Sequence, residues 1–370
     1  MLIQPPVLTF VVSAGFPDNS RIQSTTPTRK PARKQGTPSA ETDARLGRII
    51  RVLMHYPTVV ISGTKLAQEI GSTRSEVWRL VQQLRKLGVE ITGHPASGYQ
   101  LRAVPDLLLP EMLAPLLRGT IFAEHVHHYY RAGSTNTLAM EAASAGAPEG
   151  SVFLAEQQTA GRGRGSNLWH SAQSDGIYCS VILRPPLPPS EALTLSLAAG
   201  LAVKAAIEES GFPIPVDLKW PNDVLIGSRK VCGILTEMSA EATRVRHIAA
   251  GIGINVNQRS FPGELAGSAV SLQMVTGSEW SRVELCAALL KALGREYQRL
   301  LTGPEAHAET LQRFEASSSS ARGSWVRVEE NGQFEGTTEG LDPQGFLRVR
   351  TAEGLRIVYS GTVRLKASDQ

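Results

Sequence analysis

A glycine- and arginine-rich loop is the first place where this sequence could do chemistry. Two apolar, strand-like runs, 151–155 and 177–183, flank the segment Gly161-Arg162-Gly163-Arg164-Gly165. Glycine lets the backbone adopt positive φ and approach a ligand closely, and the arginine guanidinium offers a fixed fork of donors to phosphate or carboxylate. The pattern predicts a flexible anion-binding loop, although an inert or RNA-contacting surface loop fits the same letters.

Further motifs lie on both sides of this loop in the sequence. They are Ser134-Thr135-Asn136, Lys219-Trp220-Pro221-Asn222-Asp223, Arg229-Lys230-Val231-Cys232-Gly233 and Gly251-Ile252-Gly253-Ile254-Asn255. In this order they closely resemble the biotin protein ligase family, over about residues 45 to 366. A winged-helix pattern near the N-terminus makes the chain similar to the bifunctional branch, whose members are also the biotin operon repressor.

The resemblance implies an ATP-dependent biotin--[acetyl-CoA-carboxylase] ligase. The carboxylate of biotin would attack the α-phosphate of ATP to give biotinyl-5'-AMP. A lysine of the biotin carboxyl carrier protein of acetyl-CoA carboxylase would then attack this anhydride. Such a site must hold two anions together, neutralise them with cations and keep water out. The implied cofactors are biotin as substrate, ATP and Mg²⁺; Asn255 would lie near the triphosphate, and the metal ligands stay open.

The resemblance also gives roles to four catalytic residues. Arg164, together with Arg162, would cover the phosphates and the adenylate. Lys230 would bridge the biotin carboxylate and the α-phosphate, and Lys219 would assist with the nucleotide phosphates. Asp223 would orient or deprotonate the incoming lysine.

A larger set of residues would bind the ligands. Hydrogen bonds to the ureido ring are implied for Ser134, Thr135 and Gln158. Packing on biotin and adenine is implied for Trp169 and the strand 233–235. The implied ligand-binding set is Ser134, Thr135, Asn136, Gln158, Gly161, Arg162, Gly163, Arg164, Trp169, Lys230, Gly233, Ile234, Leu235 and Asn255.

Ordinary structural roles also fit some of these residues. Lys219 and Asp223 could form a surface salt bridge worth under ~1 kcal/mol, and Trp169 and Trp220 could be core side chains. The loop also departs from the family. Many bacterial members carry Arg-Gly after the second loop arginine, whereas this chain has Gly165-Ser166, so one charge fewer is present to hold the adenylate.

The net charge of +4 is placed unevenly along the chain. Residues 1–40 hold five basic residues and one acidic residue, so the remainder sums to zero. The segment 1–42 is rich in Pro, Ser, Thr and basic residues, and we expect a disordered basic tail. A DNA-binding arm, an inert tail and a misassigned start codon are the open explanations.

The cysteines and the lengths of the apolar runs indicate the cellular compartment of the protein. Cys179, Cys232 and Cys286 lack CxxC spacing and lie in apolar stretches, which is typical of buried free thiols in the cytoplasm. No apolar run approaches the roughly 18 residues that span a membrane. We therefore expect a cytoplasmic protein without a membrane partner.

Residues 43–104 have the pattern of a winged helix-turn-helix domain. Helical spacing of apolar residues covers 44–54, 64–70 and 73–87, and a hairpin at 91–101 would form the wing. Gly71 suits the end of the second helix, and Thr73 with Glu76 predicts a capping box at the start of the third.

The charge of this region favours DNA as its partner. Between 45 and 102 the sequence has nine basic and three acidic residues, an excess that suits phosphate. Arg74, Ser75 and Arg79 lie early on the presumed recognition helix, where base edges are usually read. Arg85 and Lys86 are expected to contact phosphate or solvent. A small domain used only for protein contact is the alternative.

Residues 105–318 are expected to form the catalytic domain. Strand-like runs, a few long helices and no βαβ alternation indicate an α+β fold with a mixed or antiparallel sheet; the family resemblance implies a class II synthetase-like arrangement. No P-loop is present, and Gly251-x-Gly253 lacks the third glycine of a Rossmann fingerprint. A predicted strand at 121–130 contains His125, His127 and His128, but no partner motif favours a metal there.

The last part of the chain has the pattern of a small β domain. The run of four serines at 317–320 suggests a hinge. Within 322–368, short strand-like runs separated by Asn331-Gly332, Asp342-Pro343 and Glu353-Gly354 predict an SH3-like β-barrel. The complete expectation is a multidomain α+β protein with a winged helix, a central sheet and this barrel.

Other functions fit parts of the same pattern. A lipoate/octanoate-type ligase would share the catalytic core. It would not combine this core with the motif Lys219 to Asp223, the winged helix and the C-terminal barrel. A biotin-sensing DNA-binding regulator without ligase activity would not need both loop arginines and both lysines. A ligase whose winged helix binds no operator stays open. If the chain represses, biotinyl-5'-AMP would favour a homodimer on two half-sites of operator DNA.

Overall fold

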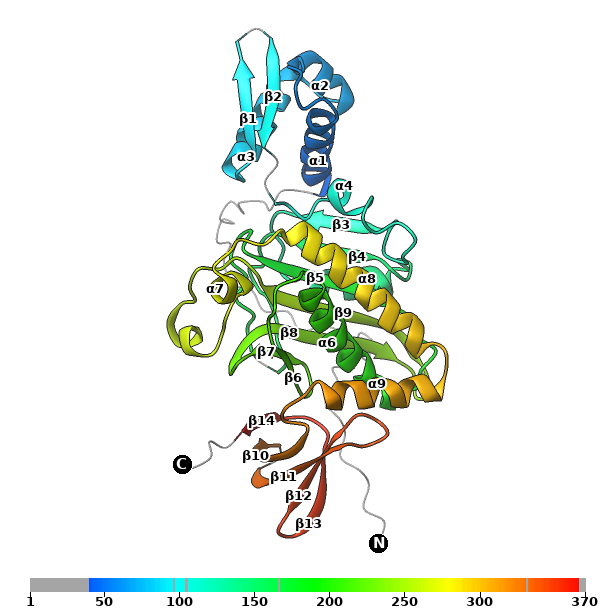
Figure 1. The fold of residues 1–370 in the computed structure, drawn as a ribbon. Coiled ribbons are helices and arrows are strands. Elements are labelled where there is room, and N and C mark those ends of the chain that lie inside the picture. Colours follow the sequence, from blue (N-terminus) through cyan, green and yellow to red (C-terminus); the bar gives the residue numbers. More distant parts are fainter. Residues whose placement is uncertain (1–39, 96, 104–105, 166, 331, 366–370) are drawn as a thin grey trace, which may run out of the picture.

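The computed structural model describes residues 40–95, 97–103, 106–165, 167–330 and 332–365. Three units follow one another along the long axis of the molecule (Figure 1). A helical unit with a two-stranded hairpin lies at one end, a seven-stranded sheet with helices lies in the middle, and a five-stranded sheet lies at the other end. The expected N-terminal tail lies almost entirely outside the described residues.

The N-terminal unit is a winged helix-turn-helix, as predicted. Its elements are α1 (Ala40–His55), α2 (Gly63–Glu69), α3 (Arg74–Lys86), β1 (Glu90–His94) and β2 (Gly98–Ala103). Thr73 is the N-cap of α3, and its hydroxyl accepts a hydrogen bond from the amide of Glu76 at 3.2 Å. Gly71 has φ +62° just after α2, where the left-handed conformation favours glycine. The glycine after α2 and the Thr73 cap of α3 are confirmed, whereas the Glu76 carboxylate accepts hydrogen bonds from Arg79.

Arg85 and Lys86 are exposed, as expected. The guanidinium of Arg85 also donates two hydrogen bonds to the carbonyl of Ile91, at 2.9 and 2.7 Å. Arg85 therefore attaches the wing to the recognition helix.

A short buried segment joins the winged helix to the central sheet. It contains α4 (Pro110–Leu113), a helix of four residues. Leu107 and Leu109 belong to the apolar core of the winged helix, whereas Leu108 and Leu113 belong to the core of the central sheet. The segment is therefore a packed joint that contributes to two cores.

The central sheet has the order β3-β4-β5-β9-β8-β7-β6. Its strands are β3 (Val126–Tyr129), β4 (Val152–Ala155), β5 (Gly176–Leu183), β6 (Val216–Lys219), β7 (Asp223–Ile226), β8 (Arg229–Ala240) and β9 (Val245–Asn255). All neighbours are antiparallel except β3 and β4, which are parallel and are joined by α5 (Thr135–Ser144). The sheet is mixed, and the expectation of no βαβ unit is wrong at this one place.

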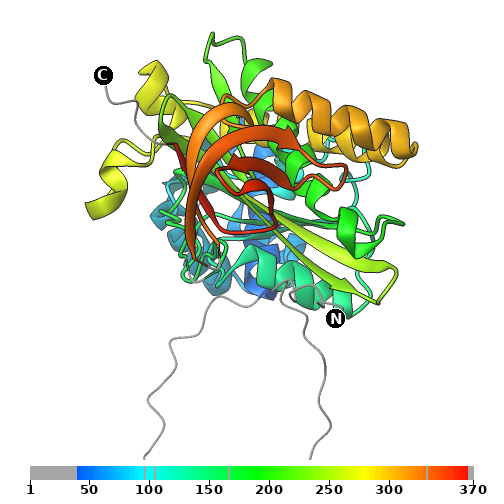
Figure 2. The ribbon, with the colours of Figure 1, turned by 90° about the horizontal axis from the view of Figure 1, so that it is seen from below.

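The two faces of the sheet differ. The helices α6 (Leu193–Glu208), α8 (Arg282–Leu300) and α9 (Pro304–Ala316) cover one face and enclose the main core. The helix α5 packs on the other face with a small cluster that includes Phe153 and Ile182. Figure 2 shows α5 on the opposite side of the sheet from α8 and α9. The part of this second face that α5 does not cover holds the candidate ligand site described below.

One segment contradicts the expectation that nothing in the chain is apolar enough to cross a membrane. Pro189–Glu208, a 3₁₀ turn at Pro189–Glu191 followed by α6, has a mean hydropathy of 1.4. However, 72% of its apolar window is buried inside the protein. The segment is the central core helix of the fold.

Two further expectations for the central region are corrected. The predicted strand at 121–130 extends only from Val126 to Tyr129, because the preceding residues form turns. The strand β7 was not predicted, since only three residues separate the end of β6 from its start. The three cysteines are free and buried, as predicted. Two short elements follow β9: a 3₁₀ turn (Gly263–Gly267) and α7 (Leu272–Thr276).

The C-terminal unit is an antiparallel sheet of order β13-β12-β11-β10-β14. Its strands are β10 (Arg322–Glu329), β11 (Gln333–Leu341), β12 (Leu347–Thr351), β13 (Gly354–Val358) and β14 (Thr362–Leu365). An SH3-like barrel stays a prediction that this sheet fits. The preceding serines are not a free hinge: the backbone and hydroxyl of Ser319 donate to the Asp217 carboxylate at 2.8 and 2.7 Å.

Candidate functional site

Glycines form the floor of the site on the open face of the sheet. Gly233 on β8 lies opposite Gly253 on β9, and Leu235 lies opposite Gly251. Because side chains alternate between faces along a strand, these positions share one face. The predicted site residue Ile234 points to the other face, where it is 2% exposed within the main core, so only its backbone can contribute.

Trp169 lies against this floor. A Cβ at Gly253 would come within 2.5 Å of the indole, and a Cβ at Gly233 within 2.8 Å. The amide of Trp169 donates to the carbonyl of Gly161 at 2.9 Å, which ties the arginine-rich loop into a hairpin. The indole is thus part of the site rather than of the core, whereas Trp220 is a core side chain with 3% exposure. Ser166 lies outside the described residues.

A polar group closes one end of the site. The side-chain oxygen of Gln158 accepts hydrogen bonds from the amide of Thr135 at 2.8 Å and from its hydroxyl at 3.2 Å. Its amide nitrogen donates to Ser171 at 3.0 Å. Ser134 is the N-cap residue of α5 but makes no capping hydrogen bond with its side chain. Gln158 therefore holds the first turn of α5 through Thr135, and Ser171 is an additional residue of the group.

Glu237 is a site residue that sequence reasoning missed. Its carboxylate accepts two hydrogen bonds from Arg162, at 3.0 and 2.5 Å, and one from Asn136 at 2.6 Å. The alternation of side chains along β8 could have indicated this residue, because Glu237 follows Gly233 and Leu235 on the same face of the sheet. The pairing occupies the fork of Arg162 and holds the loop over α5.

The cations of the site surround one carboxylate. The ammonium of Lys230 lies 2.6 Å from Asp223 and 5.5 Å from the ring centroid of Trp169. Burial lowers the pKa of Lys219, Asp223 opposes this effect, and the charge of Lys230 adds to it. Burial also lowers the pKa of Arg164, against the attraction of Asp223. Asp223 pairs with Lys230, not with Lys219 as one alternative supposed.

Two buried polar atoms in this site have no protein partner. Asn136 Oδ1 and Trp169 Nε1 are buried, and neither has a hydrogen-bond partner in the part of the chain that the structure describes. A Cβ at Gly251 would come within 2.6 Å of Asn136 Oδ1, so both atoms lie at the glycine floor. Buried polar groups are normally satisfied, and this pair indicates a ligand with hydrogen-bonding groups of its own.

Asn255 lies at the end of β9, beside the cation cluster. It is 3% exposed, and its amide donates to the backbone carbonyl of Lys230 at 3.4 Å. Within the described ranges, no group of three or more His, Cys, Asp or Glu side chains could hold a metal ion. His128, from the histidine-rich segment, instead contacts the buried Glu156 at 3.1 Å.

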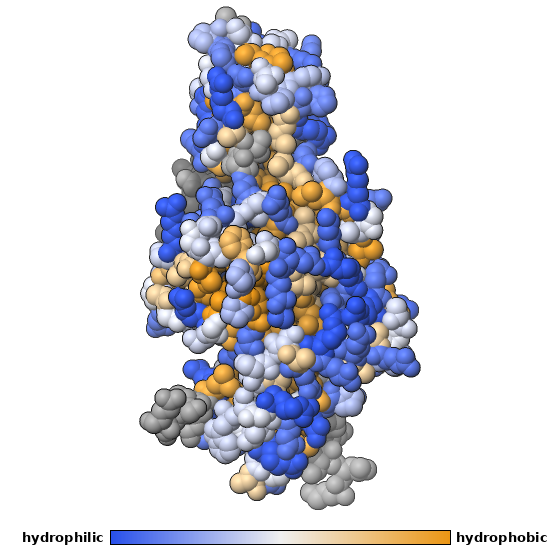
Figure 3. All heavy atoms as spheres, in the orientation of Figure 1, coloured by the Kyte–Doolittle hydropathy of each residue, from blue (hydrophilic) through white to orange (hydrophobic). Residues whose placement is uncertain are grey.

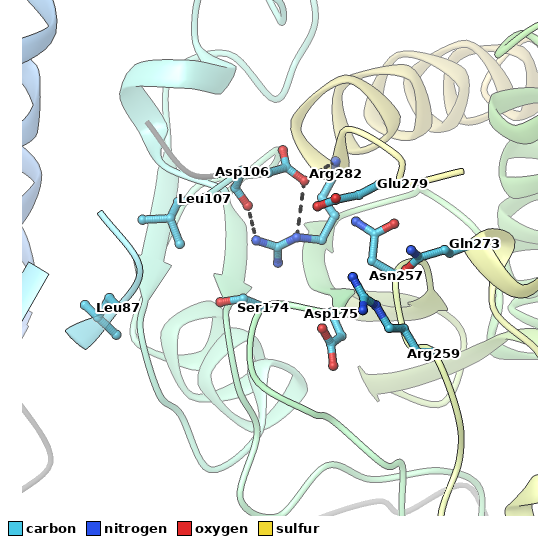
Figure 4. A pocket seen from close by; sticks show the side chains of 10 residues that line it. All are labelled: Leu87, Asp106, Leu107, Ser174, Asp175, Asn257, Arg259, Gln273, Glu279 and Arg282. Atoms are coloured by element: carbon cyan, nitrogen blue, oxygen red, sulfur yellow. Dashed lines mark hydrogen bonds and ion pairs between the residues drawn. The ribbon is translucent and has the colours of Figure 1, made fainter. Parts of the chain in front are cut away.

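A cavity of about 250 Å³ lies apart from these residues, between the winged helix and the central sheet (Figure 4). Leu87 lines it from the winged helix, and Asn257 and Arg259 line it from the segment after β9. At its wall Arg282 is bonded to Asp106, which follows the wing. None of the motif residues lines this cavity, so no sequence motif indicated it.

The predicted DNA-reading residues are not equivalent. Arg74 and Ser75 are exposed at the start of α3. Arg79 is exposed as well, but its guanidinium donates to the carboxylate of Glu76 at 2.9 and 2.6 Å. This hydrogen-bonded pairing raises the pKa of Arg79 and lowers the pKa of Glu76, so Arg79 is partly occupied within its own helix.

Comparison with known proteins agrees with this architecture. The Biotin/lipoate A/B protein ligase family matches residues 129–255, the Biotin protein ligase C terminal domain matches 323–366, and an HTH domain matches 45–100. The chain is 38% identical to the bifunctional ligase/repressor BirA of Bacillus subtilis (strain 168), over 82% of this chain and 94% of that protein.

Two further relatives are simpler or structurally known. The biotin--[acetyl-CoA-carboxylase] ligase of Mycobacterium tuberculosis is 34% identical, over 62% of this chain and 85% of that protein. The structure of biotin protein ligase from Aquifex aeolicus in complex with biotin and ATP matches with a TM-score of 0.57 and 31% identity, over 66% of this chain and all of that one. The chain belongs to the biotin protein ligase family, in its bifunctional ligase/repressor branch.

Proposed function

We propose that this protein is an ATP-dependent biotin protein ligase and a biotin-responsive transcriptional repressor. It would form biotinyl-5'-AMP and transfer biotin to a lysine of the biotin carboxyl carrier protein of acetyl-CoA carboxylase. The observation that carries the proposal is the pair of unpartnered atoms, Asn136 Oδ1 and Trp169 Nε1, at a glycine floor beside the Lys230–Asp223 pair.

Biotin would lie along the glycine floor. Its ureido ring offers both donors and an acceptor, which complement Asn136 Oδ1 and the Gln158 group. Its apolar body would pack on Gly253 and the indole of Trp169, because a side chain at Gly253 would leave no room. Its carboxylate would then reach the ammonium of Lys230.

ATP would be held by the cation cluster. The ammonium of Lys230 pairs with Asp223, and the charge of Asp223 also acts on Lys219 and Arg164. Such preorganised cations stabilise a negatively charged transition state. Lys230 would bridge the two reacting anions, and Asp223, once released from Lys230, could orient the carrier lysine. Arg162 would join the phosphates only after leaving Glu237.

The remaining partners are also part of the proposal. Mg²⁺ would be bound chiefly through the phosphates of ATP, as this ion prefers, with Asn255 nearby. The adenylate-bound protein would form a homodimer, whose two winged helices fit two operator half-sites. A cytoplasmic location is supported by three buried free thiols.

The direct test is a labelled activation assay. The full chain would be incubated with biotin, α-labelled ATP and Mg²⁺, with and without a biotin carrier domain. A biotin-dependent labelled adenylate that disappears as the carrier becomes biotinylated is the expected result. Activation of octanoate or lipoate instead would show that the pocket assignments are wrong. If no acid is activated, the ligase proposal fails and regulation alone is left.

A further inference from the structure

The recognition helix presents a large apolar side chain to solvent. Trp78, in the middle of α3, is 59% exposed, whereas the neighbouring positions Val77, Leu80 and Val81 are fully buried. Burying an indole usually contributes favourably to stability, and an exposed one is therefore suited to a partner. Its exposure exceeds the 49% of Trp325, another exposed tryptophan of the chain.

The neighbours of Trp78 narrow the kind of partner. Arg74 lies one turn before it and Gln82 one turn after it, so the three side chains follow one line on the helix surface. Arg74 is exposed and Gln82 is half-buried. Arginine and glutamine are the side chains that pair in bidentate fashion with guanine and adenine edges, and apolar groups contact the methyl group of thymine.

Two other arginines of α3 are engaged within the protein, and the remaining cation, Lys86, is exposed in the last turn of the helix. Arg79 is paired with Glu76, and Arg85 is bonded to Ile91 at the base of the wing. Along the line of Arg74, Trp78 and Gln82, the side-chain oxygen of Gln82 accepts a hydrogen bond from Arg85 at 3.5 Å, so Arg74 and Trp78 are the side chains best placed to contact a base. The surrounding unit carries nine basic and three acidic residues between 45 and 102, which complements a nucleic acid backbone.

From this placement we propose that Trp78 is a specificity-determining residue, which packs on the C5-methyl group of a thymine in the major groove. The inference rests on the DNA-binding part of the proposed function and adds a named base contact to it. Arg74 contributes both charge and base readout next to it, whereas Trp78 contributes sequence preference without charge.

The experiment starts by finding the site. The full-length protein, with biotin, ATP and Mg²⁺ present, would select a duplex from a random-sequence library, and each thymine of that duplex would then be replaced by deoxyuridine. This replacement removes only the methyl group. At one thymine we expect wild-type binding to weaken roughly five- to tenfold, the lower range for one lost base contact.

A double-mutant cycle then tests the contact. Trp78→Ala should weaken binding to the selected duplex by a similar factor and should lose its sensitivity to that one deoxyuridine. Trp78→Phe should keep part of both effects. Trp78→Ala should leave the salt dependence of DNA binding unchanged. If Arg74 also contacts a DNA phosphate, Arg74→Ala should reduce the slope of log affinity against log salt concentration by about one. Trp325→Ala, which removes an exposed indole from the C-terminal sheet, is the matched control.

The outcomes separate this inference from the broader proposal. If the wild-type protein selects no sequence, its DNA-binding function fails, and the Trp78 contact fails with it. If a site is selected but Trp78→Ala binds it like wild type, the Trp78 contact is overturned while DNA binding stands. Equal deoxyuridine sensitivity in wild type and Trp78→Ala would overturn it as well, because the methyl group would then be read by another residue.

Discussion

At the scale of single residues, the site depends on one ion pair and on glycines, which have no side chain to fill the space beside them. Lys230 and Asp223 lie 2.6 Å apart, with side chains 33% and 24% exposed, so the pair is close to solvent and can exchange partners. The glycines at 233, 251 and 253 matter for what they lack, because each leaves space that the indole or Asn136 occupies.

Removing the charge of Lys230 should disable activation without unfolding the protein. For Lys230→Met we expect adenylate formation to fall by about 10²–10³-fold, the usual loss for one preorganised electrostatic group. Single-turnover formation of labelled biotinyl-5'-AMP measures this. Lys291→Met, at an exposed position of α8, should behave like wild type. A loss of less than about fivefold for Lys230→Met would remove the bridging role.

Filling the glycine floor should displace the indole. In Gly253→Ala the new methyl group would meet Trp169 at 2.5 Å, so the ring must move, and we expect biotin-dependent activation to fall by about 10²-fold. Gly294→Ala is the control, since its Cβ would make an ordinary 3.6 Å contact with Phe122. Both rates come from the same assay, with folding checked by circular dichroism. Wild-type activity in Gly253→Ala would contradict the proposed biotin site.

At the scale of elements, α8 carries a buried charge that ties three segments together. The guanidinium of Arg282 is bonded to Glu156 at 2.8 Å and to the carbonyl of Gly176 at 3.1 Å, and it also contacts Asp106. Glu156 in addition accepts from the amide of Leu108 at 2.9 Å. The cluster thus connects α8, the ends of β4 and β5, and the joint to the winged helix.

Breaking this cluster should destabilise the central unit strongly. Arg282→Met leaves the carboxylate of Glu156 buried without its cation, which typically costs about 3–5 kcal/mol. Arg295→Met on the same helix removes an exposed pair with Glu209 and should cost under about 1 kcal/mol. Urea unfolding followed by near-ultraviolet circular dichroism compares the two. Equal losses of unfolding free energy in the two variants would mean that burial of the Arg282–Glu156 pair does not affect stability.

The same cluster predicts a dependence of stability on pH. Burial alone would raise the pKa of Glu156, but the hydrogen bond to His128 and the charge of Arg282 lower it from 4.5 to about 2. A carboxyl with a lowered folded pKa stabilises the fold above its unfolded pKa and loses this contribution as pH falls. The advantage of wild type over Glu156→Gln should therefore be complete above pH 4.5 and shrink toward pH 2. A pH-independent difference between the two unfolding free energies would contradict this origin.

At the scale of the whole molecule, the end units contribute to the middle one. Apolar residues gather mainly over the central part of the surface, and both ends are largely hydrophilic (Figure 3). In the C-terminal unit, the charge of Arg364 adds to the burial that lowers the pKa of Lys219, and the charge of Glu330 opposes the burial that lowers the pKa of Arg164. The electrostatics of the cation cluster therefore include residues from two units.

A single buried hydrogen bond should report on the docking of the C-terminal sheet. The indole nitrogen of Trp220 donates to the carbonyl of Gly345 at 2.9 Å. Trp220→Phe leaves this buried carbonyl unsatisfied, at a cost of about 1–3 kcal/mol, and hydrogen exchange in β11 and β12 should become faster. Trp325→Phe, at an exposed position, should leave the exchange unchanged. Unaltered exchange in Trp220→Phe would mean that other contacts hold the sheet.

Local patterns in the sequence determined the element types and the chemistry. Thr73 with Glu76 fixed the start of α3, Gly71 fixed the end of α2, and the apolar period of 3.6 residues placed the long helices within a few positions. These signals act between near neighbours, so they need no tertiary context. The motif residues also indicated an anion-activating site, through their resemblance to the biotin protein ligase family.

Only the tertiary structure decided which of these residues meet. Strand register turned Ile234 into the core and brought Glu237 to Arg162, because a side chain's face depends on pairing across the sheet. The partners of Lys230, Gln158 and Glu156 come from distant strands and helices, and no local pattern specifies a contact at such separation. The packed joint at 107–113 and the docked serines before the last sheet were likewise decided by burial, which depends on the whole fold.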